Sequence, residues 1–190
     1  VSHKVYVGFQ QSTGATETVV SKHEVEIDAK SCGVDLKSFR ADNGIFKPEE
    51  FRIDLDDKDQ RIAFCGVGAH HQNGVGERHI RTFVEKARTV LLNAHARWPD
   101  KIDLELWTFA IRHVVNQWNN TPRADLNYQI PDERFNRIKQ GNVNRKRHFQ
   151  NFHPFGCPVY VLEEDLQGNV KHPKWKPRTK VGVYLVSTNH

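Results

Sequence analysis

Two acidic residues of this 190-residue chain stand in local contexts that suit metal chemistry. Asp42 lies in the segment RADNG (40–44), after a short apolar stretch, and Glu77 lies in QNGVGER (72–78), where a long amphipathic stretch begins; 34 residues separate the two acids. Carboxylates on neighbouring elements can share divalent ions, which activate a nucleophile and stabilise the transition state of phosphoryl transfer. Because Mg2+ and Mn2+ prefer oxygen ligands, the pair predicts a site for Mg2+ (or Mn2+).

Each acid also has an ordinary structural explanation. The sequence Asp-Asn-Gly suits a tight turn, and an acid in the first helical turn is favoured by the helix dipole. Cys65, His70 and His71 lie between the two acids, but their spacing matches no standard zinc set and a second cysteine pair is missing. The metal interpretation and the structural one therefore both stay open for Asp42 and Glu77.

The elements expected around the acids alternate between strands and helices. Period-two alternation predicts strands, and apolar residues at three- and four-residue steps predict helices. The expected strands are 5–9, 34–39 and 61–65, and the expected helices are 15–30 with Ser12 or Thr13 as cap, a short one from Pro48, one from Glu77 onward, and 104–119. Positions 77, 80 and 84 stack on a helix, so we expect the Glu77 carboxylate to point toward the sheet edge.

The last third of the chain changes character. Residues 123–151 lose apolar periodicity and gain lysine and arginine, which predicts a partly helical basic linker. From Phe155 a strand pattern returns, and the segments 157–162 and 179–185 predict short strands of a small barrel.

Composition is that of a soluble globular protein, with 37% hydrophobic and 27% charged residues. No apolar run is long enough for a membrane span, and the three cysteines fit no disulfide framework. Residues 1–60 hold 8 Lys/Arg and 12 Asp/Glu, whereas residues 61–190 hold 20 and 11. A basic surface beside an acidic site suits a phosphate-bearing partner, although a solvated basic face is the plain alternative.

These motifs together resemble the second and third acids of the retroviral-type integrase core, in its copia-type retrotransposon branch. The resemblance extends over essentially the whole chain. It rests on DNG at 42–44, QNGVGER at 72–78 continuing to Thr82, Trp107, NTP at 120–122, FGCPVYV at 155–161 and KVGVYL at 180–185.

The resemblance implies an α/β fold. Its parts would be a ribonuclease H-like integrase core with a mixed sheet flanked by helices at 1–122, the basic linker at 123–151, and a small C-terminal β-barrel (Src-homology-3-like) at 152–190. It also implies three acids and two metal ions that trim the 3′ ends of element DNA and join them to target DNA, with Asp42 and Glu77 as catalytic metal ligands. The family's first acid would precede Val1, so we expect this chain to be a polyprotein fragment that is inactive alone.

The resemblance also suggests which residues contact DNA. They are His71, Gln72 and Asn73 of the loop, Arg78 and Arg81 of the helix, Arg145, Lys146 and Arg147 of the linker, and Lys174, Trp175 and Lys176 of the barrel. Three simpler alternatives remain: a Glu77–Arg81 pair one helical turn apart, a solvated linker or nuclear address at 145–147, and lysines that protect a barrel edge. The implied partners are retroelement DNA ends and target DNA.

The implied setting is the nucleus or a cytoplasmic virus-like particle, with a homo-oligomer as the working form and no membrane partner. Two other function classes compete with the integrase. One is a non-catalytic nucleic-acid-binding module from a decayed or domesticated retroelement, which the absent first acid leaves open. The other is a ribonuclease H acting on hybrid duplexes, which would need more carboxylates near the metals.

Overall fold

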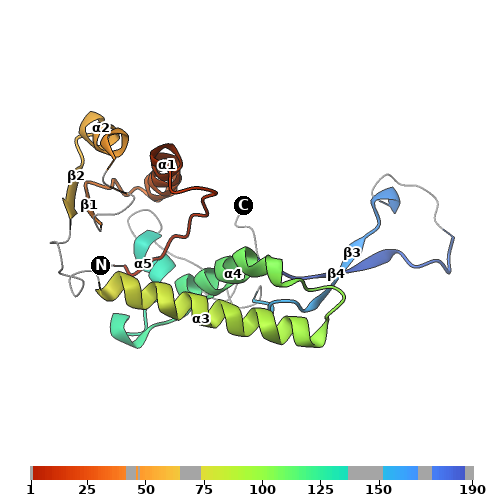
Figure 1. Cartoon of the computed structure of the whole chain (residues 1–190). Coiled ribbons are helices and arrows are strands. Elements are labelled where there is room, and N and C mark those ends of the chain that lie inside the picture. Colours follow the sequence, from red (N-terminus) through yellow and green to blue (C-terminus); the bar gives the residue numbers. More distant parts are fainter. Residues whose placement is uncertain are drawn as a thin grey trace. The chain divides into compact units, whose positions relative to one another are not determined.

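Figure 1 shows a computed structural model of the chain, which describes residues 2–41, 46, 48–64, 74–136, 152–166 and 173–186, without the side chains of Val75 and Asp165. The described residues form a mixed α/β structure of helices and two small sheets. The chain divides into two compact units, one of Val1–Phe83 with Gln117–Asn144 and the other of Val84–Asn116 with Arg145–His190. The domain boundaries expected at 122 and 151 stay a prediction. No helix among the described residues is long and apolar enough to cross a membrane.

Helix α1 (Ala15–Ser31) confirms the first expected helix. Its N-cap is Gly14 and makes no side-chain cap, so the expected cap at Ser12 or its neighbour is wrong. The carboxylate of Glu17 in the first turn instead holds the segment before the helix, because it accepts hydrogen bonds from the Ser12 N–H at 3.2 Å and the Ser12 hydroxyl at 2.8 Å. The helix ends at Ser31, and Gly33 after it has φ of +78°, the left-handed conformation that glycine adopts without strain.

The first unit contains a parallel strand pair. Strand β1 (Ser38–Ala41) and strand β2 (Arg61–Phe64) pair so that Ala41 lies opposite Phe64, and helix α2 (Glu49–Asp57) connects them. Strand β1 begins later than the expected 34–39 because the Val34 N–H bonds to the Ala29 carbonyl at the end of α1. The other expected strand of this pair, at 61–65, is confirmed at Arg61–Phe64.

An ionic cluster joins α1 to α2, which lie side by side in Figure 1. Lys22 is only 6% exposed and pairs with Glu26 at 2.7 Å and Asp54 at 2.5 Å. His23 Nε2 and Lys58 Nζ also reach Asp54, at 2.6 and 3.3 Å. Burial by itself raises the pKa of Asp54, but the hydrogen bonds from Lys22, His23 and Lys58 outweigh burial and lower that pKa to about 2.

The N-terminal segment is not the strand expected at 5–9, since residues 2–10 form no strand. Its backbone bonds to side chains instead. The Asn119 amide accepts from the Val5 N–H at 2.9 Å and donates to the Val5 carbonyl at 2.7 Å, while the Trp118 indole donates to the His3 carbonyl at 3.2 Å. Lys4 pairs with Asp28 at 3.2 Å and Asp132 at 2.9 Å.

Helices α3 (Gly74–Arg97) and α4 (Trp107–Asn120) follow one another through the short 3-10 helix η2 (Leu104–Leu106). The buried apolar strip of α3 is Phe83, Ala87, Leu91 and Ala94. The sequence predicts an apolar strip of Ile80, Phe83, Val84, Ala87, Leu91 and Ala94; four of these are buried as expected, but Ile80 is 66% and Val84 49% exposed, so the face expected for positions 77, 80 and 84 is wrong. On α4 it predicts a seam of Leu104, Trp107, Ile111, Val114 and Trp118. Val114 is buried, whereas Leu104 and Trp107 are exposed and Ala110 is buried instead.

The chain after α4 contains the short elements η3 (Ala124–Leu126), α5 (Pro131–Asn136) and η4 (Glu164–Leu166). The sequence predicts a partly helical basic linker at 123–151, and its described part, 123–136, contains η3 and α5 and buries Leu126, Ile130 and Pro131. Strands β3 (Pro158–Leu162) and β4 (Thr179–Val183) form an antiparallel pair. The described residues contain this two-stranded ribbon, and the barrel stays a prediction.

The segment before β3 docks on α3 within the second unit. Gly156 has φ of +74°, and a Cβ at this position would lie 2.6 Å from the Ala94 Cβ. Its N–H donates to the Tyr184 carbonyl at 2.7 Å, while the Tyr184 N–H donates to the Cys157 carbonyl at 2.8 Å. The FGC part of the FGCPVYV motif is therefore a packing motif that fastens the start of the ribbon to α3.

Candidate metal and nucleic-acid site

The first predicted metal ligand follows strand β1 directly in the sequence. Parallel pairing puts the carboxyl ends of β1 and β2 at one edge, where Ala41 is opposite Phe64, and ligands of α/β sheets gather at such edges. Ala41 is buried at 7% exposure, so β1 is fixed up to its last residue. Asp42 itself lies outside the described residues, and its role stays a prediction.

The second predicted ligand, Glu77, lies in the first turn of α3 with its side chain exposed. His79 continues the packed strip of this helix, because its ring contacts Phe83 at 6.1 Å and Trp118 at 5.3 Å between centroids. Two residues along an α-helix span roughly 200°. Glu77 therefore faces almost opposite to His79 and lies roughly 100° from the centre of the packed strip, on the flank of the helix, where its side chain is exposed.

The Glu77 carboxylate is chemically available. Among the described residues no hydrogen bond or ion pair engages it, so the alternative Glu77–Arg81 pair is not formed. Arg78 and Arg81 expose their side chains on the same two turns. An exposed carboxylate without another partner fits a hard divalent cation, and it equally fits a helix-dipole acid. No group of three or more metal-ligating side chains occurs among the described residues, so a metal site would need ligands from outside them.

The first turns of α3 are anchored by an aromatic cluster, in which the sequence patterns placed Phe83 and Trp118 on packed faces but not His79 or Arg123. Trp118 contacts the ring of Phe83 at 5.1 Å, and the Arg123 guanidinium stacks on the Trp118 indole with its carbon 3.5 Å from the ring centroid. Burial lowers the pKa of His79, and the nearby charges of Arg123, His3 and Arg78 lower it further. The sequence signal for His79 is its spacing of four residues from Phe83, because residues four apart lie next to each other on a helix surface.

The predicted DNA contacts are distributed unevenly over the described residues. His71, Gln72 and Asn73 of the loop lie outside them, as do Arg145, Lys146 and Arg147 of the linker. Lys174, Trp175 and Lys176 are described, and all three are exposed. Arg78 and Arg81 belong to the first unit and the 174–176 group belongs to the second, so each is treated separately.

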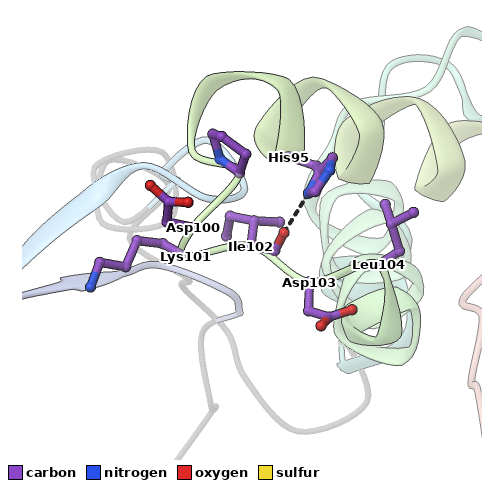
Figure 2. A pocket seen from close by; sticks show the side chains of 7 residues that line it. His95, Asp100, Lys101, Ile102, Asp103 and Leu104 are labelled. Atoms are coloured by element: carbon purple, nitrogen blue, oxygen red, sulfur yellow. Dashed lines mark hydrogen bonds between the residues drawn. The ribbon is translucent and has the colours of Figure 1, made fainter.

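A hollow of about 340 Å³ lies at the turn between α3 and α4, lined by His95 and residues 99–104 (Figure 2). His95 Nδ1 donates to the carbonyl of the fully buried Ile102 at 2.6 Å, the dashed line in Figure 2. A carbonyl oxygen can only accept, so this bond places a proton on Nδ1 and fixes the turn. We therefore interpret His95 as a structural residue.

Comparison with known proteins finds a similarity to a retrotransposon polyprotein. No family model matches the chain. The chain is 26% identical over 161 residues to the "Retrovirus-related Pol polyprotein from transposon TNT 1-94" of Nicotiana tabacum, a match that covers 84% of this chain. It covers 11% of that relative's length. The similarity supports a segment of a retrotransposon polyprotein, without specifying which part.

Proposed function

We propose that the chain is a fragment of a copia-type retrotransposon integrase. The parent enzyme would be a metal-dependent polynucleotidyl transferase that trims the 3′ ends of element DNA and joins them to target DNA. The similarity to a retrotransposon polyprotein over 84% of the chain supports the origin. The observation that carries the chemistry is the Glu77 carboxylate, exposed and unengaged among the described residues at the start of α3.

The fold part of the proposal is a ribonuclease H-like core followed by a small barrel. Two features support it. The parallel pair β1 and β2 is connected by α2 and precedes the long helix that carries Glu77, and the antiparallel pair β3 and β4 follows near the C-terminus. In this arrangement Asp42 would come after β1, at the sheet edge where α/β proteins bind ligands.

The proposed roles follow from charge and position. Asp42 and Glu77 would hold Mg2+ or Mn2+, which activates the attacking hydroxyl and neutralises charge at the phosphate. Arg78 and Arg81 are exposed beside Glu77 in the sequence and would bind the phosphate backbone on either side of it. The partners would be element DNA ends and target DNA, engaged by a homo-oligomer in the nucleus or in a virus-like particle.

Metal binding by this chain tests the proposal directly. Mn2+ titration followed by electron paramagnetic resonance should show that Glu77→Gln and Asp42→Asn each raise the Kd on the order of tenfold, because each removes a charged oxygen ligand. Glu85→Gln is the matched control, since Glu85 is another exposed acid of α3. Mn2+ binding unchanged in both acid variants would refute the metal site.

Activity separates the competing functions. A longer polyprotein segment that contains this chain should trim and join duplex DNA ends, and Glu77→Gln should abolish both reactions. Cleavage of RNA–DNA hybrids instead would indicate a ribonuclease H. Metal-independent nucleic-acid binding without trimming, together with wild-type Mn2+ behaviour in the acid variants, would indicate the non-catalytic module.

A further inference from the structure

The turn before β4 presents a tryptophan to solvent. The Lys176 N–H donates to the Pro173 carbonyl at 3.1 Å, so 173–176 is a hydrogen-bonded turn with Lys174 and Trp175 at its central positions. Trp175 is 90% exposed, and Lys174 Nζ lies 5.8 Å from its ring centroid. Tryptophan is strongly buried on average. The position at the tip of a turn leaves this indole open to a partner, with the Lys174 ammonium over one of its faces.

The sequence of this turn and of the strand that follows it carries only positive charge. From residue 173 to residue 186 the sequence contains the four basic residues Lys174, Lys176, Arg178 and Lys180 and no acidic residue. Lys180 pairs with Glu163 across the ribbon at 2.8 Å, whereas Lys174 and Lys176 extend from the turn itself. This charge complements a partner with closely spaced negative charges, as in a phosphate backbone. Protection of a strand edge would account for the lysines, but not for an exposed tryptophan.

The ribbon that carries the turn separates its aromatic and basic side chains by face. Tyr160 lies opposite Val181 and Val161 lies opposite Lys180, and successive residues of a strand point to opposite faces. Tyr160 is 74% exposed, so the ribbon offers a second open aromatic on the face away from Lys180. Arg178 continues the pairing, since its carbonyl accepts from the Glu163 N–H at 3.0 Å, and it shares the Lys180 face.

We propose that the turn 173–176 binds an unpaired nucleic-acid strand, with one base stacked on Trp175 and adjacent phosphates held by Lys174 and Lys176. The faces of bases are accessible in a single strand and hidden in the stack of a duplex. An exposed indole between two lysines therefore discriminates between these substrates, because it recognises a face that only the single strand offers. This inference rests on the proposed function and deepens it by assigning unpaired strands to this surface.

Oligonucleotide binding measured by fluorescence anisotropy tests the assignment. The probe is a labelled thymidine oligomer of about 12 nucleotides, in EDTA so that no metal contributes. Trp175→Ala should raise the Kd about tenfold and leave the salt dependence unchanged, and Trp175→Phe should retain most of the affinity. Replacing Lys174 and Lys176 by Gln should reduce the slope of log K against log salt by about 1.4, at about 0.7 per phosphate of a single strand.

Tyr160→Ala is the matched control, because it removes an equally open aromatic from the other face of the ribbon. It should leave both the Kd and the salt slope unchanged, and a duplex of the same length should bind more weakly than the single strand. Equal losses from Tyr160→Ala and Trp175→Ala, or tight duplex binding that Trp175→Ala does not affect, would overturn the assignment. A uridine oligomer of the same length distinguishes RNA from DNA as the source of the strand.

The same assay keeps the two proposals apart. Glu85→Gln, which changes an exposed acid outside both proposed sites, should bind the oligomer as the unmodified chain does. Mn2+ binding that is unchanged in Glu77→Gln and Asp42→Asn, together with Trp175-dependent oligomer binding, would count against the metal site alone. Failure of Trp175-dependent binding with intact Mn2+ binding would count against the surface alone.

Discussion

The side chain of Asn119 replaces a strand neighbour for the N-terminal segment. Its amide makes both backbone hydrogen bonds that a strand partner would make at Val5, at 2.9 and 2.7 Å, and it is only 9% exposed. A buried backbone group without a partner costs more than a typical hydrogen bond contributes. The segment at 5–9 therefore depends on Asn119 for the backbone hydrogen bonds that a neighbouring strand would provide in a sheet.

Asn119→Ala should consequently destabilise the chain by about 1–3 kcal/mol, because it leaves the Val5 N–H and carbonyl without partners. Urea unfolding followed by circular dichroism measures the loss. Asn93→Ala is the control, since Asn93 is exposed on α3 and brings the same gain in helix propensity. Equal free energies of unfolding for both variants would show that the Val5 pairing contributes nothing.

Sequence patterns identified the segment near Asn119 only in part. The NTP motif correctly predicted a helix end, and α4 stops at Asn120. The strand predicted at 5–9 from side-chain alternation is wrong, because alternation cannot show whether a strand or a side chain will pair with the backbone. Glu77 was correctly placed at the start of a helix. The prediction that it lies on the packed face of this helix was wrong, because His79 lies on that face and Glu77 is exposed.

At the scale of elements, the start of the β3–β4 ribbon is fastened to α3 by the contact of Gly156 with Ala94. A Cβ on Gly156 would lie 2.6 Å from the Ala94 Cβ, and φ of +74° disfavours any side chain. Buried His113 packs beside this contact, between the rings of Phe155 at 5.6 Å and Tyr184 at 6.0 Å. The sequence shows that position 156 is glycine, but it does not show that helix α3 packs directly against this residue.

Gly156→Ala should therefore destabilise the second unit by at least about 1–2 kcal/mol, from backbone strain together with the steric clash. Ala94→Gly costs about 1 kcal/mol by itself in a helix interior, but in the double variant it also removes the clash, so the double variant should lose less than the sum of the two single losses. Thermal unfolding measures all three variants. Gly182→Ala is the control, because its Cβ would meet Val159 at an ordinary 3.5 Å. Losses that add would mean that the clash does not contribute.

Over the whole molecule, the uneven charge found in the sequence has a structural counterpart at its acidic end. Part of the excess acid in residues 1–60 goes into the cluster between α1 and α2, where Glu26 and Asp54 share Lys22 and Lys58. Charge counts indicated an acidic region, but they could not show that these acids form ion pairs, because pairing depends on how the two helices face each other. The basic remainder includes the exposed turn at 173–176.

This cluster should make the stability of the folded chain depend on pH in a defined range. The pKa of Asp54 is lowered from 3.8 to about 2, so its contribution to the free energy of unfolding is complete above about pH 4 and is lost as the pH falls through about 2. Asp54→Asn should cost at least about 1 kcal/mol at neutral pH, because Lys22 then stays buried with one partner fewer.

The difference between Asp54→Asn and the unmodified chain should shrink between about pH 4 and pH 2, since the protonated Asp54 resembles asparagine in charge. Urea unfolding at stepped pH values measures this difference. Asp56→Asn, an exposed acid of α2, is the matched control and should give a small difference at every pH. A difference for Asp54→Asn that stays constant down to about pH 2 would show that the ionised form of Asp54 does not stabilise the fold.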